Sequence, residues 1–151
     1  METTNTKNTA ALIHLSTLSQ YLVPFGNYIL PVVIWSSTKD KSPYIDAQGK
    51  QAINFQLSLF LYTLVLGLIA FPILFFTVFK NVTLSSIFNG EDWIIENFSL
   101  GNISGMVAVA VMAGFLFCAL KVTEFFLIIY ASVQSSNGED FKYPLTIPFI
   151  K

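Results

Sequence analysis

The sequence predicts an all-α fold, a polytopic helical membrane protein with two long transmembrane helices after an N-terminal broken helical hairpin, four helical segments in all. Residues 51–79 and 97–120 contain no charged side chain and are rich in Leu, Ile, Val, Phe and Ala. Roughly 20 helical residues cross a bilayer, where only helices or closed barrels satisfy their backbone groups. Charged residues make up 11% of the chain, against about 25% in soluble domains. The lipid bilayer is therefore the first expected partner.

The charge distribution argues against nucleic acid as a partner. The lysines are scattered, the chain has no arginine and its formal net charge is -1, so there is no basic patch to follow a phosphate backbone. No repeat or linker divides the chain, and we expect a single integral membrane domain over residues 1–151. Its other expected partners are a membrane protein or a second copy of itself in a homo-oligomer.

A polar N-terminal tail, residues 1–9, precedes a broken hydrophobic helix pair at residues 10–35. The break is predicted at Pro24, which lacks a backbone donor, followed by Gly26 and Asn27, which tolerate positive φ angles. Each half is too short to cross a membrane alone. We therefore expect a re-entrant or interfacial hairpin. The alternative is a single kinked span, which would put the N-terminus on the other side of the membrane.

A long helix is predicted at residues 47–79. Ser42 and Pro43 fit an N-cap and first-turn pair, and Asp46 is a second capping candidate. Because the helix exceeds the bilayer thickness, its first turns should lie at the interface or under other helices. Pro72 is expected to kink it.

An external connector at residues 81–102, with Trp93 as an interfacial anchor, leads to a second long helix at residues 103–133. The polar run ending at Gly138 is a helix stop signal. In the C-terminal tail, residues 139–151, the two prolines exclude helix.

Lysine placement predicts the orientation, because basic residues in short loops stay in the cytoplasm. The loop at residues 36–50 holds three lysines, whereas the connector at residues 81–102 holds none. Lys142 and Lys151 lie in the tail. We expect a multi-pass protein of the bacterial plasma membrane with this loop and the C-terminus in the cytoplasm.

Several short motifs, in order along the chain, resemble a known family. The motif positions are Pro24, Gly26, Asn27, Asp46, Gly49, Asn54, Phe55, Gln56, Tyr143 and Pro144. In them the chain resembles the bacterial Tic-twenty-like small membrane proteins, long described as a domain of unknown function. These are remotely similar to the small polytopic subunit of the chloroplast inner-envelope import translocon. The resemblance implies an all-helical multi-pass protein with both termini in the cytoplasm, if the plastid topology holds. It supplies no activity of its own, and a role in protein translocation is inferred only from the plant relative. Gln48 and Gln51 replace His and Glu common in that family.

Motifs for chemistry are absent from the sequence. It contains no metalloprotease helix, nucleophile elbow, phosphate-binding loop or cysteine pair, so we predict no catalytic residue, cofactor or metal site and no enzyme activity. His14 could pair with Glu124 or Asp46, but a simple hydrogen-bonded role is expected. Cys118 lies in an apolar run and is expected to be a small buried side chain.

Lys121 and Glu124 are three residues apart on one predicted helix and can therefore pair. A charge at mid-membrane costs about 2.5 to 3.5 kcal/mol, so both should face protein or water. Antiparallel packing would set Glu124 beside Asn54 and Ser58, with the hairpin as cover. We therefore predict a polar cluster of Asn54, Gln56, Lys121 and Glu124 in the cytoplasmic half of the bundle.

Such a cluster has two interpretations. It could line a hydrophilic groove that receives a polypeptide or a solute, or it could tie helices together. The favoured function is a non-enzymatic membrane protein that acts through helix packing and partner contacts, in protein translocation or membrane-complex assembly. The alternative is a small oligomeric transporter or channel-like protein, since one copy has too few spans to enclose a pore.

Overall fold

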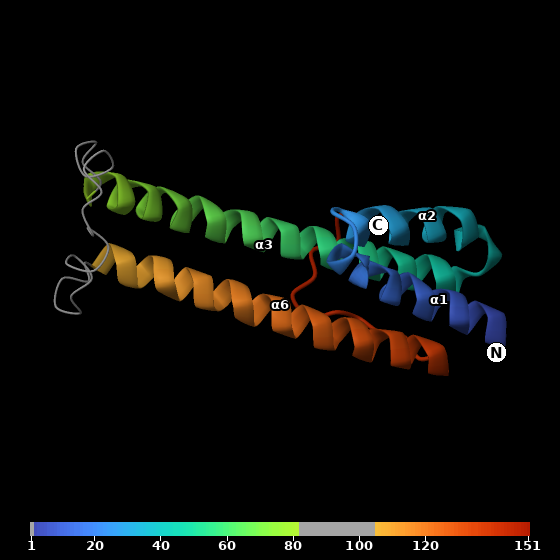
Figure 1. The fold of residues 1–151 in the computed structure, drawn as a ribbon. Helices are drawn as coiled ribbons and strands as arrows, with labels where there is room; N and C mark the ends of the chain where they lie inside the picture. Colours follow the sequence, from blue (N-terminus) through green and yellow to red (C-terminus); the bar gives the residue numbers. More distant parts are fainter. Residues whose placement is uncertain (1, 82–104) are drawn as a thin grey trace. The chain divides into compact units, whose positions relative to one another are not determined.

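The computed structural model of the chain describes residues 2–81 and 105–151, with the side chains of residues 77–81, 105 and 106 left aside. The described elements are helices: α1 (Thr4–Ser16), α2 (Gly26–Thr38), α3 (Pro43–Asn81) and α6 (Gly105–Asn137), with 3-10 turns at Thr17–Tyr21 and Lys39–Lys41 (Figure 1). Two of them are long and apolar enough to cross a membrane, over Pro43–Phe76 and Val107–Asn137. The all-α prediction, with two long helices and a broken hairpin, is confirmed.

The chain forms two compact units. Unit 1 consists of Met1–Leu61 with Leu120–Lys151, and unit 2 of Tyr62–Ala119. Unit 1 therefore holds α1, α2, the first half of α3, the second half of α6 and the C-terminal tail. The polar side chains discussed below all belong to unit 1.

The α1–α2 hairpin is the first element of unit 1. Helix α1 begins at Thr4, inside the expected polar tail, because Thr3 Oγ1 accepts a hydrogen bond from the Thr6 N–H at 3.2 Å. Helices α1 and α2 pack against each other, as Figure 1 shows. The first apolar stretch is thus a hairpin and not a kinked span.

The turn of the hairpin uses its residues differently from the prediction. The positive φ angle, 62°, belongs to Phe25 and not to Gly26 or Asn27. Gly26 is required instead for close approach, because a Cβ there would lie 2.6 Å from Ser19 Oγ and 2.9 Å from the Ser19 carbonyl oxygen. Pro24 lies exposed in the turn.

Helix α3 begins at Pro43, earlier than the expected start near Ala47. Ser42 Oγ accepts a hydrogen bond from the Tyr44 N–H at 3.1 Å, which is the N-cap arrangement with proline in the first turn. Asp46 is therefore not the cap. It pairs with Lys50 at 2.6 Å and accepts a hydrogen bond from Trp35 Nε1 at 3.0 Å.

Near its start, at Gly49, helix α3 packs closely against α2. A Cβ on Gly49 would overlap the Trp35 ring, so the glycine lets the indole lie against the α3 backbone. Trp35 packs with Ile34 against a small apolar core of Ile13, Ile45 and Ala52. Helix α3 then continues through Pro72 to Asn81.

Helix α6 ends with a Schellman motif. Gly138 has a φ of 84°, its N–H donates to the Ser135 carbonyl at 3.0 Å, and the Glu139 N–H donates to the Gln134 carbonyl at 3.1 Å. These bonds satisfy carbonyls that a helix end leaves free. The helix thus extends to Asn137, beyond the expected end at Val133, and the tail after Gly138 contains no helix.

Unit 2, as far as its side chains are described, presents mainly exposed apolar residues such as Leu68, Phe71 and Phe115. Cys118 is also exposed, so the prediction that it is buried in the protein is wrong. In a membrane-spanning helix an apolar run can face lipid and need not face a protein core. The predicted connector and its anchor Trp93 lie outside the described residues.

Candidate functional site

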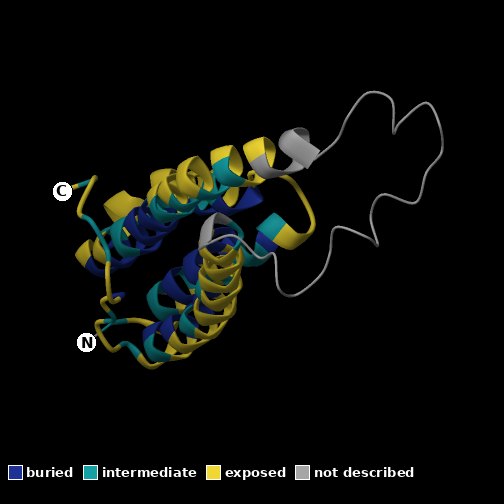
Figure 2. Ribbon diagram, turned by 90° about the vertical axis from the view of Figure 1, so that its left-hand side faces the viewer, coloured by how far each residue is buried: buried dark blue, intermediate teal, exposed yellow. Residues whose placement is uncertain are grey.

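Unit 1 buries polar side chains together with apolar ones, and Figure 2 marks the buried stretches of the helices in dark blue. Burying a polar group is costly unless it finds a hydrogen-bond partner. The contacts among these groups therefore define the candidate site, which we call the polar network. Its buried members are His14, Thr17, Asn27, Gln48, Asn54, Gln56, Ser58, Glu124, Ser132 and Ser135.

His14 of α1 joins the network to the C-terminal tail. Its Nδ1 lies 2.9 Å from the Tyr143 hydroxyl and its Nε2 lies 3.1 Å from Gln48 Oε1. Gln48 Oε1 also accepts from the Ser135 hydroxyl at 3.3 Å. Because Oε1 only accepts, the proton of His14 belongs on Nε2, and Nδ1 accepts from Tyr143.

Burial keeps this group neutral. Desolvation lowers the pKa of His14 to about 4, against a partial rise from its bond to Gln48, and burial also raises the pKa of the Tyr143 hydroxyl. His14 does not hydrogen-bond Glu124 or Asp46. The expected simple hydrogen-bonded role is the one observed, with partners that the sequence did not indicate.

The C-terminal tail packs on α3 through one aromatic ring and its main chain. The Tyr143 ring stacks on Phe55 with centroids 4.0 Å apart. Asn54 accepts from the Ile150 N–H at 2.8 Å and donates to the Ile150 carbonyl at 2.9 Å, and Ser58 Oγ accepts from the Ile147 N–H at 2.8 Å. Asn54 thus holds the tail, whereas we expected it beside Glu124 and the hairpin.

Gln56 faces the other way, toward α2. Its Oε1 accepts a hydrogen bond from Asn27 Nδ2 at 2.8 Å, while Gln56 Nε2 has no partner among the described residues. One turn further along α3, Phe60 meets the Tyr28 ring edge-on, with centroids 6.3 Å apart. The contact fixes the hairpin turn beside the middle of α3.

The predicted pair of Lys121 and Glu124 is present, and the Gln20 side chain joins it to form a triad. Lys121 Nζ lies 2.8 Å from Glu124 Oε2. Gln20 Nε2 donates to Glu124 Oε1 at 2.9 Å, and Gln20 Oε1 accepts from Lys121 at 3.3 Å. Glu124 is 1% exposed and Lys121 36%. The sequence signal for Gln20 was only that of a polar residue within an apolar stretch.

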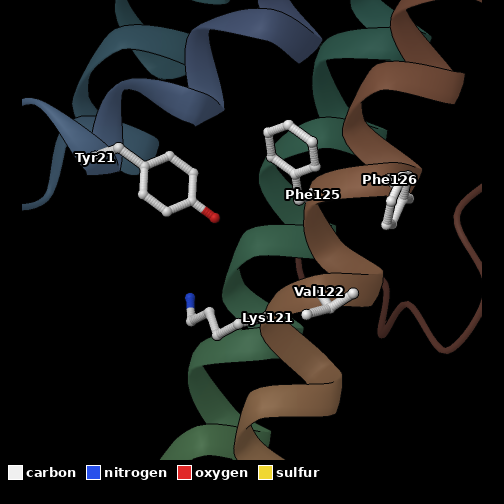
Figure 3. Close-up of a pocket in the computed structure, with 5 residues that line it drawn as sticks. All are labelled: Tyr21, Lys121, Val122, Phe125 and Phe126. Carbon is white, nitrogen blue, oxygen red and sulfur yellow. The ribbon is translucent and has the colours of Figure 1, made fainter.

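A shallow hollow adjoins this triad. It has a volume of about 310 Å³ and is lined by Tyr21, Lys121, Val122, Phe125 and Phe126. Figure 3 shows the Tyr21 hydroxyl and the Lys121 ammonium turned toward each other across it. The lining is mostly apolar. Among the residues whose side chains are described, 2–76 and 107–151, no three His, Cys, Asp or Glu residues lie close enough to hold a metal ion.

The predicted cluster is therefore divided among three contacts of one network. Lys121 and Glu124 come together with the hairpin through Gln20, Gln56 meets the hairpin through Asn27, and Asn54 binds the tail. Of the other motif positions, Asp46 and Gly49 lie beside Trp35, and Pro144 is exposed next to the anchored Tyr143. Asp46 and Gly49 thus serve the contact between α2 and α3.

The described part of the protein has two helices that can cross a membrane, and its polar side chains hydrogen-bond its own segments to one another. These features define the class of small multi-pass membrane proteins. The match to a family model is more specific: residues 5–150 match the magnetosome magnetite crystal formation protein family, MamF/MmsF, and the chain belongs to this family. Comparison with curated proteins and with solved structures gave no match.

The family assignment corrects the resemblance drawn from the motifs. The Tic-twenty-like assignment is wrong, because the matching family model is that of MamF/MmsF and covers the same motifs. The expected role in protein translocation rested on that assignment and is therefore not supported either. Both families are small helical membrane proteins, and the quoted motifs reflect packing needs of such proteins, such as a glycine at a helix contact or an asparagine beneath the tail.

Proposed function

We propose that this chain is a non-enzymatic protein of a bacterial membrane, the magnetosome membrane, and that it takes part in magnetite crystal formation through its folded surface. The observation that carries the proposal is the family match over residues 5–150, which includes every member of the polar network. The name of the family indicates the process, magnetite crystal formation. The contacts of the polar network indicate how the chain would act in that process.

The polar network supports a non-catalytic role. General acid-base catalysis needs a titratable group that can reach a substrate. The His14 ring nitrogens contact Tyr143 and Gln48, and the Glu124 oxygens contact Lys121 and Gln20. Both side chains are fully enclosed. These groups hold the hairpin and tail on the long helices, so the unit they stabilise would present a fixed surface to partners in the membrane.

The orientation belongs to the same proposal. The lysine-rich segment at residues 36–50 and the lysines of the tail support a cytoplasmic position for that end of unit 1. The N-terminus lies at this end too, since Lys7 Nζ donates to the Asn137 carbonyl at 3.0 Å. Reporter fusions at both termini would then give cytoplasmic signals.

The direct test is complementation. A magnetite-forming bacterium lacking its own member of the family would express this chain with a tag, and electron microscopy would measure crystal number and size. Recovery toward normal crystals, with the tag in the magnetosome membrane, is expected. The Gly49→Ala variant, which disturbs the Trp35 contact, should recover less than the Gly67→Ala control. Normal amounts of protein in that membrane with unchanged crystals would contradict the proposal.

One observation favours a second candidate, a small oligomeric transporter. Lys121 and Glu124 lie within an apolar helix, and Lys121 borders an open hollow. Ionisable groups inside a membrane often mark a solute path. Several copies would be required to enclose one. Solute flux into proteoliposomes that is abolished by Lys121→Met would favour this candidate over the first.

A further inference from the structure

The turn of the α1–α2 hairpin presents apolar side chains outward. Leu22 is 87% exposed and Phe25 70%, and Val23 between them is exposed as well. The chain carries no charged side chain from Leu15 to Thr38. A contiguous apolar patch of this kind is unusual on a surface that faces water and marks contact with a membrane or another apolar partner.

The opposite end of the hairpin is charged, and both of its helices reach that end. The Ser42 hydroxyl, just before α3, donates to Glu2 Oε2 at 3.1 Å. Lys39 lies over the Trp35 ring, 5.2 Å from its centroid. Tryptophan and lysine together are typical of the bilayer interface. The hairpin thus has a polar end with an interfacial anchor and an apolar turn.

Three N–H groups of the turn find acceptors within the protein. The Leu22 and Val23 N–H groups donate to the Ser19 carbonyl at 3.0 and 2.8 Å, and the Gly26 N–H donates to the Val23 carbonyl at 3.0 Å. The hydroxyl of Ser19 donates to the Ser16 carbonyl at 2.6 Å. Irregular backbone is tolerated at membrane depth only where its polar groups find partners within the protein.

From these observations we infer that the α1–α2 hairpin is re-entrant: its turn is immersed in the hydrocarbon of one leaflet, and lipid acyl chains are what its exposed apolar residues contact. Helix α2 begins at Gly26, and from Trp35 back to this first residue it rises about 14 Å at 1.5 Å per residue. The hydrocarbon core is about 30 Å thick. A hairpin anchored at Trp35 therefore reaches the middle of the bilayer and returns to the surface from which it entered.

Spin labelling of the full chain in phosphatidylcholine vesicles tests this inference. In a Cys118→Ala background, one label is placed at the turn by Phe25→Cys and a matched control label at the charged end by Asp40→Cys. At position 25 we expect a collision rate with oxygen several-fold above that with a water-soluble nickel complex, and at position 40 the reverse. Leu22→Cys provides a second position in the turn, and circular dichroism verifies folding.

Two results would overturn the inference. A turn label that collides freely with nickel lies in water, and unit 1 would then be a head outside the bilayer. A turn label shielded from both oxygen and nickel is covered by protein, which makes a second copy the occupant in place of lipid. Neither result depends on any role in magnetite formation, so the two proposals can fail separately.

Discussion

The Tyr143 hydroxyl donates a hydrogen bond to Nδ1 of His14 at 2.9 Å, joining residues 129 positions apart in the chain. The bond connects the C-terminal tail to the first helix within a buried site. The Tyr143 ring also stacks on Phe55. Tyr143 thus combines an apolar contact with a polar one, and the two can be separated by mutation.

Replacing Tyr143 by Phe should keep the stacked ring and remove only the hydroxyl. The Nδ1 acceptor of His14 is then buried without a donor, which typically costs about 1 to 3 kcal/mol. Thermal or denaturant unfolding in detergent measures the loss. The matched control is Tyr130→Phe, because the Tyr130 hydroxyl contacts Gln134 on an exposed surface and its removal should change stability by less than about 0.5 kcal/mol. Equal effects of both variants would contradict the buried role of Tyr143.

Acidification should destabilise the fold through His14. The pKa of folded His14, about 4, lies below the ordinary histidine value of 6.5. Between these pH values the unfolded chain therefore binds a proton that the folded chain does not bind. The contribution to stability is complete above pH 6.5 and is lost as pH falls toward 4, by about 3 kcal/mol in all. As His14 is the only histidine of the chain, NMR titration of its ring reads the folded pKa directly.

The control for this pH effect is His14→Asn, which removes the titrating ring and offers an oxygen acceptor to Tyr143. The difference in unfolding free energy between wild type and variant should shrink as pH falls from 6.5 to 4. A constant difference over that window, or a ring that titrates near pH 6.5 in the folded protein, would show that His14 is not enclosed as described.

Local features of the fold were predictable from sequence because they depend on neighbouring residues. The Ser42–Pro43 capping pair, the stop at Gly138 and the pairing of Lys121 with Glu124 all follow from short-range chemistry. The helix itself was expected to begin only at residue 47. The break near Pro24 was also predictable. Its detailed form was not, because Gly26 is constrained by Ser19, a contact that exists only after the hairpin closes.

The long-range part of the network could not be predicted. Gln20 and Glu124 are 104 positions apart, and Gln48 meets Ser135 across 87. Which polar side chains meet depends on the rotation of each helix about its axis, and a helix that is apolar on nearly all sides gives no periodic signal for that rotation. Asn54 was accordingly assigned to Glu124, although its neighbour is the tail.

The Lys121–Glu124 pair should show coupling in a double-mutant cycle. Glu124→Leu removes the carboxylate and leaves the Lys121 ammonium with Gln20 alone. Interhelical and membrane-buried polar contacts measured this way contribute about 0.6 kcal/mol on average and up to about 1.7. We expect coupling toward the upper value, because Glu124 is enclosed, with the double variant Lys121→Met, Glu124→Leu recovering part of the loss. Additive effects of the two single changes would show that the two side chains lie next to each other without a stabilising interaction.

Gly49 offers the sharpest test of packing between α2 and α3. A Cβ at this position would overlap the Trp35 ring, whereas a Cβ at Gly67, in the same helix, would meet nothing within 4 Å. Gly49→Ala should therefore destabilise the protein by about 1 to 3 kcal/mol through overpacking. Gly67→Ala should be neutral or stabilising by up to about 1 kcal/mol, since alanine favours helix over glycine. Unfolding in detergent gives both values. In a Trp93→Phe background Trp35 is the remaining tryptophan of the chain, so its fluorescence reports whether the indole has moved. If Gly49→Ala were as stable as Gly67→Ala with unchanged Trp35 emission, the close contact between this glycine and the indole would be refuted.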